Sequence, residues 1–173
     1  MSPFVSNLSL LTKLQLQNNG LHGEIQSSFG DLSELAHLNL SSNKLQGNIP
    51  ASVQGCSSLK LMDLSNDNLA GVIPQQIGLM KSLTYLALSL NSFMGSVSFL
   101  VNLTEMIQLE LGYNYFTGKI PPELGALKKL EIMYFHVNYL EGPIPAEISN
   151  CTALREISLI DNMLSGEIPT EMS

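Results

Sequence analysis

Residue types that commonly perform catalysis or bind metals occur in this chain, but their spacing supports neither role. The three histidines, His22, His37 and His136, lack the spacing typical of zinc ligands. Acidic residues are scattered, and no two carboxylates are placed for general acid–base catalysis. The sequence contains no nucleophile-elbow motif, and its spacing does not indicate a Ser-His-Asp triad. We therefore expect no enzymatic activity, no bound metal and no cofactor.

The tyrosines suggest a different kind of chemistry, which is molecular recognition. Tyrosine offers a large rigid contact area together with a hydrogen-bonding hydroxyl, and it is enriched at binding hot spots. All tyrosines of the chain fall between residues 85 and 139: Tyr85, Tyr113, Tyr115, Tyr134 and Tyr139. Whether they share a surface depends on the elements that position them.

Those elements are set by an internal repeat, whose fullest copy runs from Leu35 to Pro50. Neighbouring copies open at a constant interval, except that the step from Leu83 to Met106 is shorter by a single position. The copies open at Leu11, Leu35, Leu59, Leu83, Met106, Leu130 and Leu154. A fixed period of this length, within the range of roughly 20 to 29 residues, and this leucine and asparagine spacing are typical of a leucine-rich repeat solenoid.

Within each repeat the apolar positions predict a short parallel strand. Leu38 and Leu40 are separated by one residue, which is the alternation of a half-buried strand. Each copy also carries a glycine at the same later position, which suggests a positive φ or a close backbone contact. The glycines are Gly23, Gly47, Gly71, Gly95, Gly118, Gly142 and Gly166. The Ile49-Pro50 pair that follows in the fullest copy fits a segment on the convex side, where no ladder donor is needed.

The expected fold is therefore an α/β-type solenoid, a right-handed leucine-rich repeat superhelix. One strand per repeat would line the concave face, and irregular or 3-10 segments would form the convex face. We expect residues 1–173 to form a single array, with a partial repeat at residues 1–10 and an incomplete last repeat. A single repeat cannot fold alone, because ordering its backbone costs more free energy than its own apolar burial returns.

A column of amides is predicted to link the repeats. It occupies the same position in every copy and comprises Asn19, Asn43, Asp67, Asn91, Asn114, Asn138 and Asn162. A buried amide can satisfy backbone groups that the turning chain would otherwise leave unpaired. Asp67 is the exception, because a carboxylate has no donor. We expect it to leave carbonyl groups unsatisfied or to take up a proton.

The two cysteines are expected to be buried thiols. Cys56 and Cys151 occupy a column that is filled by leucine or methionine in other repeats. They lie four repeats apart, roughly 19 Å at a strand spacing of about 4.8 Å, whereas a disulfide needs Cα atoms within about 7 Å. They therefore cannot pair, and they should pack as small hydrophobic side chains.

Alternation places the residues two, four and six positions after each opening on the concave face. In the fourth to sixth repeats these columns and the adjoining rim hold every tyrosine. The candidate ligand-binding residues are Tyr85, Glu110, Tyr113, Tyr115, Tyr134, His136 and Tyr139. The alternative is that tyrosine fills these exposed positions only because it favours strands.

The repeat resembles the plant-specific leucine-rich repeat. The segments Leu140-Glu-Gly142-Pro-Ile144-Pro145 and Leu164-Ser-Gly166-Glu-Ile168-Pro169 carry this resemblance, which extends from Leu11 to Pro169. It implies the ectodomain of a plant receptor-like serine/threonine kinase or receptor-like protein, which would bind a peptide or protein on its concave face. A leucine-rich-repeat co-receptor could take part.

The resemblance also implies a glycoprotein at the extracellular face of the plasma membrane, with a role in signal transduction for defence or development. The alternatives are a secreted enzyme inhibitor resembling the polygalacturonase inhibitors, and a truncated, non-functional gene product. No kinase motif is present, so any kinase activity would belong to a domain outside this chain. The first ten residues are not expected to be a signal peptide, and no apolar run approaches the ~20 residues of a membrane span.

Charge and sequons complete these expectations. The formal net charge is -7 and Arg155 is the single arginine, which argues against nucleic acid as a partner. Asn-x-Ser/Thr sequons make four asparagines candidates for glycosylation: Asn7, Asn39, Asn102 and Asn150. Asn39 is expected on the strand face, and the other three on the convex side.

Overall fold

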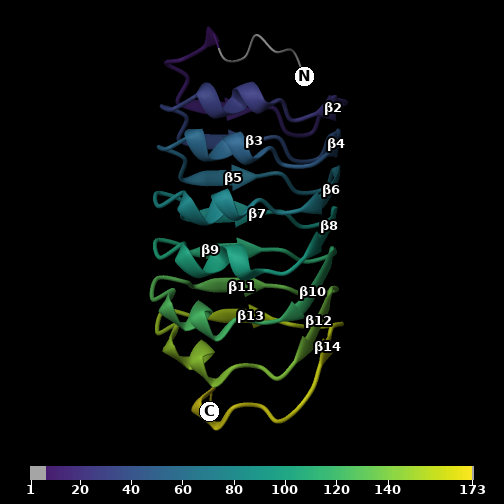
Figure 1. Ribbon diagram of the computed structural model, residues 1–173, viewed down its shortest axis with the longest axis vertical. Coiled ribbons are helices and arrows are strands. Elements are labelled where there is room, and N and C mark those ends of the chain that lie inside the picture. Colours follow the sequence, from purple (N-terminus) through teal and green to yellow (C-terminus); the bar gives the residue numbers. More distant parts are fainter. Residues whose placement is uncertain (1–6, 173) are drawn as a thin grey trace.

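The computed structural model describes residues 7–172, which form a stack of coils. The coils pile up along the long axis of the molecule, and equivalent segments of successive repeats lie side by side (Figure 1). Residues 1–6 of the expected partial repeat and the last residue lie outside the described part. Within residues 7–172, none of the helices has the length and apolar character needed to cross a lipid bilayer.

The first sheet is parallel, and its strands follow the order of the repeats. Its strands are β1 (Lys13–Gln15), β3 (His37–Asn39), β5 (Leu61–Asp63), β7 (Tyr85–Ala87), β9 (Gln108–Glu110), β11 (Ile132–Tyr134) and β13 (Glu156–Ser158). Each residue pairs with its equivalent one repeat later, as Leu38 does with Met62. This register confirms the predicted strand columns and lines up the variable positions in rows.

A second parallel sheet was not expected from the sequence. Its strands are β2 (His22–Glu24), β4 (Lys44–Gly47), β6 (Asn68–Val72), β8 (Ser92–Gly95), β10 (Tyr115–Lys119), β12 (Tyr139–Gly142) and β14 (Met163–Leu164). The prediction of one strand per repeat is therefore wrong. All of these strands except β14 contain a glycine of the glycine column. Glycine is depleted in strands, so neither composition nor alternation marked them.

The glycine column explains the bend of the second strand. All seven glycines have positive φ angles, between 76° and 88°. This conformation is costly for other residues but accessible to glycine. The expectation of positive φ at this column is confirmed, and each glycine lies in a strand of the second sheet or, for Gly166, two residues after β14.

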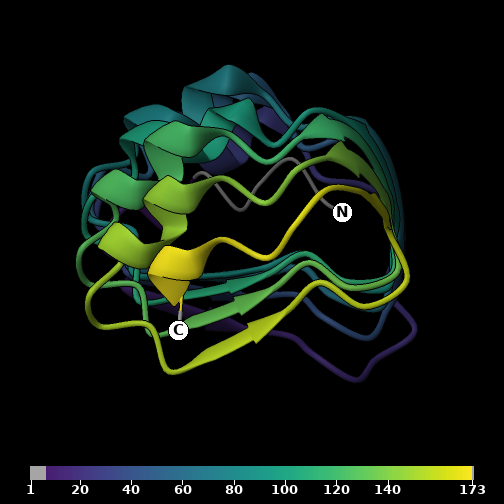
Figure 2. The ribbon, with the colours of Figure 1, turned by 90° about the horizontal axis from the view of Figure 1, so that it is seen from below.

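Short 3-10 helices form the convex side, as predicted. They are η2 (Ser27–Asp31), η3 (Ala51–Gly55), η4 (Gln75–Leu79), η5 (Ser98–Asn102), η6 (Pro122–Ala126), η7 (Ala146–Asn150) and η8 (Thr170–Met172). Seen along the stack, they lie across the coil from the first sheet, while the second sheet closes another side (Figure 2). Pro50 precedes η3 in an extended conformation, and its carbonyl accepts a hydrogen bond from Val53 N.

The space inside the coils is a continuous apolar core. Leu38, Leu40 and Ile49 are each at most 1% exposed. Five phenylalanines are fully buried in this core: Phe29, Phe93, Phe99, Phe116 and Phe135. Because every coil shares this core with its neighbours, its apolar burial depends on stacking.

Both cysteines are buried free thiols, as expected. Cys56 Sγ donates to the carbonyl of Phe29 at 3.1 Å, and Cys151 Sγ donates to that of Leu124 at 3.2 Å. Burial, together with the charge of Asp31, raises the pKa of the Cys56 thiol to about 11. Burial also raises the pKa of the Cys151 thiol. Each thiol therefore stays protonated at neutral pH and links its coil to the preceding one.

The asparagine column forms a hydrogen-bonded ladder between coils. Asn43 Nδ2 donates to the carbonyl of Leu16 in the preceding repeat at 3.0 Å and to that of Leu40 at 2.7 Å. Its Oδ1 accepts a hydrogen bond from Leu21 N at 3.0 Å. The same pattern recurs at Asn91, Asn114, Asn138 and Asn162. Among the described residues, Asn19 donates to the carbonyls of Leu16 and Gln17 of its own coil.

Asp67 occupies the ladder position but makes only the accepting part of this hydrogen-bond pattern. Its Oδ1 accepts from Leu45 N at 2.7 Å, as an asparagine would. Its Oδ2 is shielded from solvent and has no hydrogen-bond partner among the described residues. Burial, with a smaller effect of Asp63, raises the pKa of Asp67 to about 6 despite its backbone hydrogen bonds.

The Asp67→Asn variant should unfold at a higher temperature than the parent chain at pH 7 to 8. The folded-state pKa of Asp67 lies above the unfolded value of about 3.9, so the folded chain binds more protons between pH 4 and 6. Stability from this group is present below pH 4 and is lost as the pH rises through 6. The asparagine variant should gain about 1–3 kcal/mol at neutral pH.

Thermal unfolding of both proteins between pH 4 and 8 tests this expectation. The gap in melting temperature should narrow as the pH falls towards 4. Asp31→Asn provides the control, because it removes the same charge at an exposed site away from the ladder. Equal melting temperatures at every pH would mean that the Asp67 side chain is not confined in the ladder.

Candidate functional site

The predicted ligand-binding residues divide into two neighbouring groups. Tyr85, Glu110 and Tyr134 lie in β7, β9 and β11 of the first sheet, on its exposed side. Tyr115 and Tyr139 instead begin β10 and β12 of the second sheet. Tyr113 and His136 belong to the segments between the sheets and lie where the two groups meet.

Carboxylates accept hydrogen bonds from the tyrosines on the exposed, concave side of the first sheet, which we call the inner face. The Tyr85 hydroxyl donates to Glu110 Oε1 at 3.1 Å, and Gln108 Nε2 donates to the same oxygen at 2.5 Å. The Tyr134 hydroxyl donates to a carboxylate oxygen of Glu156. Burial and the charge of Glu110 raise the pKa of Tyr85, so this hydroxyl remains a donor. Each hydroxyl bond thus fixes the orientation of its ring.

His136 stands between two tyrosine rings. Its ring centroid is 5.2 Å from that of Tyr113 and 6.0 Å from that of Tyr134, with interplanar angles of 88° and 66°. Such edge-to-face contacts are favourable between aromatic rings. The ring rests over Gly112, where a Cβ atom would lie 2.6 Å from imidazole atoms. Glycine at this position therefore makes room for the imidazole, a relation that the sequence did not reveal.

A hollow of about 280 Å³, which we call the inner hollow, opens beside these rings. It is lined by Tyr113, Tyr134, His136, Val137, Ser158, Ile160 and Asp161. Its residues come from the fifth to seventh repeats. The parallel register brings together positions that lie one or two repeats apart in the sequence.

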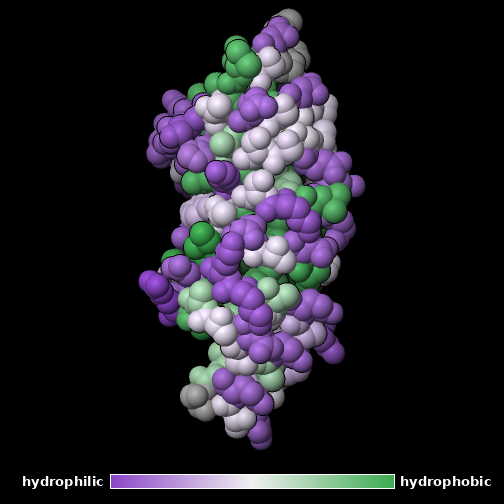
Figure 3. Space-filling view, turned by 90° about the vertical axis from the view of Figure 1, so that its left-hand side faces the viewer, coloured by the Kyte–Doolittle hydropathy of each residue, from purple (hydrophilic) through white to green (hydrophobic). Residues whose placement is uncertain are grey.

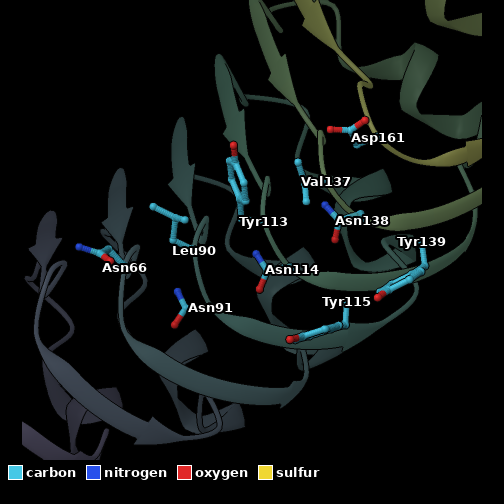
Figure 4. A pocket seen from close by; sticks show the side chains of 10 residues that line it. All are labelled: Asn66, Leu90, Asn91, Tyr113, Asn114, Tyr115, Val137, Asn138, Tyr139 and Asp161. Carbon is cyan, nitrogen blue, oxygen red and sulfur yellow. The ribbon is translucent and has the colours of Figure 1, made fainter.

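A larger groove of about 550 Å³, the flank groove, lies on the other side of Tyr113. Tyr115 and Tyr139 stack along one wall, with ring centroids 6.0 Å apart and planes inclined by 12°. Tyr113 and Val137 lie on the opposite wall, with ladder asparagines between the two walls (Figure 4). The full lining is Asn66, Leu90, Asn91, Tyr113, Asn114, Tyr115, Val137, Asn138, Tyr139 and Asp161.

One residue column, five members of which line this groove, adopts a left-handed backbone conformation. It directly precedes the ladder column, with φ between 52° and 58°: Asn18, Ser42, Asn66, Leu90, Tyr113, Val137 and Asp161. Asparagine and aspartate tolerate this conformation, whereas a β-branched valine is strained in it. The strained members Leu90, Tyr113 and Val137 are consecutive, and all line the flank groove. Strain that is retained in this way is typical of functional sites.

The opposite flank of the solenoid has a different character. It consists of the turns that lead from the 3-10 helices into the first sheet, and its surface is mostly hydrophilic with small scattered apolar areas (Figure 3). Leu79 and Ile107 are among its exposed apolar residues. The tyrosines therefore lie on the inner face and on the flank that carries the second sheet.

The described residues provide little charge neutralisation at the site. Their ion pairs are Lys129 with Glu105 at 2.5 Å and Arg155 with Glu131 at 3.8 Å, all on exposed side chains. Glu110, Glu156 and Asp161 have no cationic partner among residues 7–172. In the same part of the chain, no cluster of three or more histidine, cysteine, aspartate or glutamate side chains is arranged for a metal.

The sequons are spread over the two faces of the solenoid. Asn102 and Asn150 end η5 and η7 on the convex side, where the sequence placed them, and Asn7 is exposed. Asn39 lies in β3, and its Oδ1 accepts hydrogen bonds from the backbone and hydroxyl of Ser41. Glycosylation of these asparagines stays a prediction, which glycopeptide mapping of secreted protein would check.

Comparison with known proteins identifies the solenoid. Two family models of leucine-rich repeats match the chain, one over residues 9–69 and the other over residues 105–127. None of the curated proteins compared matches it. The plant peptide hormone receptor RGFR1, solved in complex with RGF2, matches with a TM-score of 0.98 and 33% identity. The match covers 99% of this chain and 28% of RGFR1.

Two Arabidopsis receptor kinases are also similar. HAESA, solved with the peptide hormone IDA and the co-receptor SERK1, matches with a TM-score of 0.96 and 34% identity over 99% of this chain and 29% of its own. The leucine-rich-repeat ectodomain of SOBIR1 from Arabidopsis thaliana has a TM-score of 0.73 and 36% identity, over 76% of this chain and 72% of its own. The chain belongs to the leucine-rich-repeat family of plant receptor-kinase ectodomains. It spans less than a third of the length of RGFR1 and HAESA.

The left-handed column generates a stability prediction. Val137→Asn should stabilise the chain by about 1 kcal/mol, because asparagine tolerates a φ of 53° better than valine does. The reciprocal change Asn66→Val, at the equivalent position with a φ of 56°, should destabilise by a similar amount. Chemical unfolding midpoints measure both effects. If Asn66→Val is as stable as the parent chain, the column is not strained.

Proposed function

We propose that this chain is the ligand-recognition part of the ectodomain of a plant receptor-like kinase or receptor-like protein. Its ligand would be a peptide or protein bound to the inner face of the fourth to seventh repeats. The observation that carries this proposal is the aromatic inner hollow, in which Tyr113 of the fifth repeat meets Tyr134 and His136 of the sixth. Family membership supports the same reading, because RGFR1 and HAESA were solved with peptide hormones.

The geometry of the inner face favours recognition through side chains. Backbone groups of the first sheet are used in pairing between neighbouring repeats, so a ligand crossing the strands meets projecting side chains. Tyr134 and Tyr85 are already oriented by their hydroxyl bonds, which lowers the entropy lost on binding. The inner hollow is concave and combines apolar walls with a few polar groups, as ligand sites usually do.

Partners and location follow from the same proposal. A co-receptor could contact the flank of the complex, in keeping with the SERK1-containing structure of HAESA. The chain would act outside the cell, as part of a membrane receptor that signals in defence or development. We assign it no catalytic role, and kinase activity would reside in another part of the receptor. A secreted enzyme inhibitor receives less support, because Lys13 is the only lysine or arginine in the concave columns.

Double substitution of Tyr113 and Tyr134 by alanine should weaken ligand binding at least about tenfold, since aromatic hot-spot residues commonly contribute about 2 kcal/mol or more. A library of extended synthetic peptides, screened against the parent chain, would supply the probe. Affinities of the selected peptides are then measured by calorimetry for both proteins.

Gln54→Ala, at an exposed position of η3, is the matched control and should bind like the parent chain. Unchanged affinity of the double variant would remove the inner face from consideration. Absence of any binder from the screen would contradict peptide recognition by this chain.

A further inference from the structure

The inner hollow has chemistry suited to a positively charged group. Three aromatic rings, those of Tyr113, Tyr134 and His136, border one space of about 280 Å³. The faces of aromatic rings carry negative potential and attract Lys or Arg side chains within about 6 Å. The hollow also includes Asp161, an exposed carboxylate.

Further negative charge surrounds these rings. The hydrogen bond from the Tyr134 hydroxyl to Glu156 raises the pKa of Tyr134, with smaller effects of burial and of the charges of Glu156 and Glu110. The hydrogen bonds to Glu110 and Glu156 come from neutral donors, which leave the negative charge uncompensated. The concave columns of the third to seventh repeats contain no lysine or arginine.

We infer that the inner hollow binds a cationic side chain, arginine or lysine, of the peptide ligand. This inference rests on the proposed function and specifies its ligand chemistry. The guanidinium or ammonium group would lie against the rings of Tyr134 and His136, with Asp161 as its counter-charge. The planar guanidinium of arginine suits stacking on aromatic faces better than a lysine ammonium does.

Gly112 acts here as a positioning residue. The imidazole of His136 occupies the space that a side chain at Gly112 would need, at 2.6 Å from the Cβ position. Gly112 has no positive φ, so alanine is compatible with its backbone. The Gly112→Ala variant should therefore fold. Its new methyl group should displace the imidazole and weaken ligand binding in the inner hollow, while the carboxylates remain unchanged.

The probe for this inference is N-acetyl-arginine-N-methylamide, titrated into the full chain with isotope-labelled tyrosine and histidine. Aromatic NMR signals of Tyr113, Tyr134 and His136 should shift in a saturable manner. N-acetyl-citrulline-N-methylamide has the same shape without the charge and should bind about fivefold more weakly, as expected for an exposed cation–π contact with a nearby carboxylate.

Three variants refine the test. Asp161→Asn retains a residue that tolerates the left-handed conformation and should weaken arginine binding but not citrulline binding. Gly112→Ala should weaken both, with a small change in melting temperature. Gln54→Ala, at an exposed position of η3 away from the inner hollow, is the control and should leave the arginine titration unchanged.

The possible outcomes separate this inference from the proposed function. Equal binding of the arginine and citrulline derivatives, or preferential binding of N-acetyl-phenylalanine-N-methylamide, would overturn cation recognition. If the affinity of the selected peptides still depended on Tyr113 and Tyr134, the proposed function would stand without cation recognition. A saturable arginine shift that disappears in Asp161→Asn would establish the hollow as a cation site.

Discussion

The structure depends on the hydrogen-bonded register between successive coils. Each ladder amide from the second repeat on donates to a carbonyl of the preceding coil and accepts from a backbone N–H of that coil, so the turn between the two sheets is fixed. Asp67, which only accepts, is the exception. The first sheet applies the same register to the strands. Equivalent positions of successive repeats lie in rows, about 4.8 Å from one strand to the next. Residues that differ between repeats therefore form a surface whose chemistry changes along the stack.

This register explains how a recognition surface arises without altering the core. The residues beside the ladder are free to vary, and in the fourth to sixth repeats they include Leu90, Tyr113 and Val137 in a conformation that suits asparagine better. The backbone N–H of each of these residues donates to a carbonyl of the next coil, and the ladder residue follows directly, so their positions are fixed. The inner hollow and the flank groove share Tyr113, which connects the two surfaces.

Much of the fold could be predicted because apolar residues recur at the same buried positions in every repeat. Leu38 and Leu40 recur at fixed positions, so the first sheet, the core and the 3-10 segments follow from the period. The second sheet could not be predicted, because its strands are short and most of them contain glycine. The tyrosines were expected on or beside one face, but they divide between two sheets: Tyr115 and Tyr139 belong to the unexpected strands. The support of His136 by Gly112 depends on a side-chain position that no sequence pattern encodes.

Hydrogen exchange of individual backbone amides tests the ladder most directly. The amides of Leu69, Phe93 and Phe116 are outside the first sheet and donate to Asn91, Asn114 and Asn138 in the next coil. They should exchange as slowly as the central amides of β7 and β9, since opening them requires separation of two coils. Fast exchange at these three amides, with slow exchange in the first sheet, would show that the side-chain ladder does not hold the coils together.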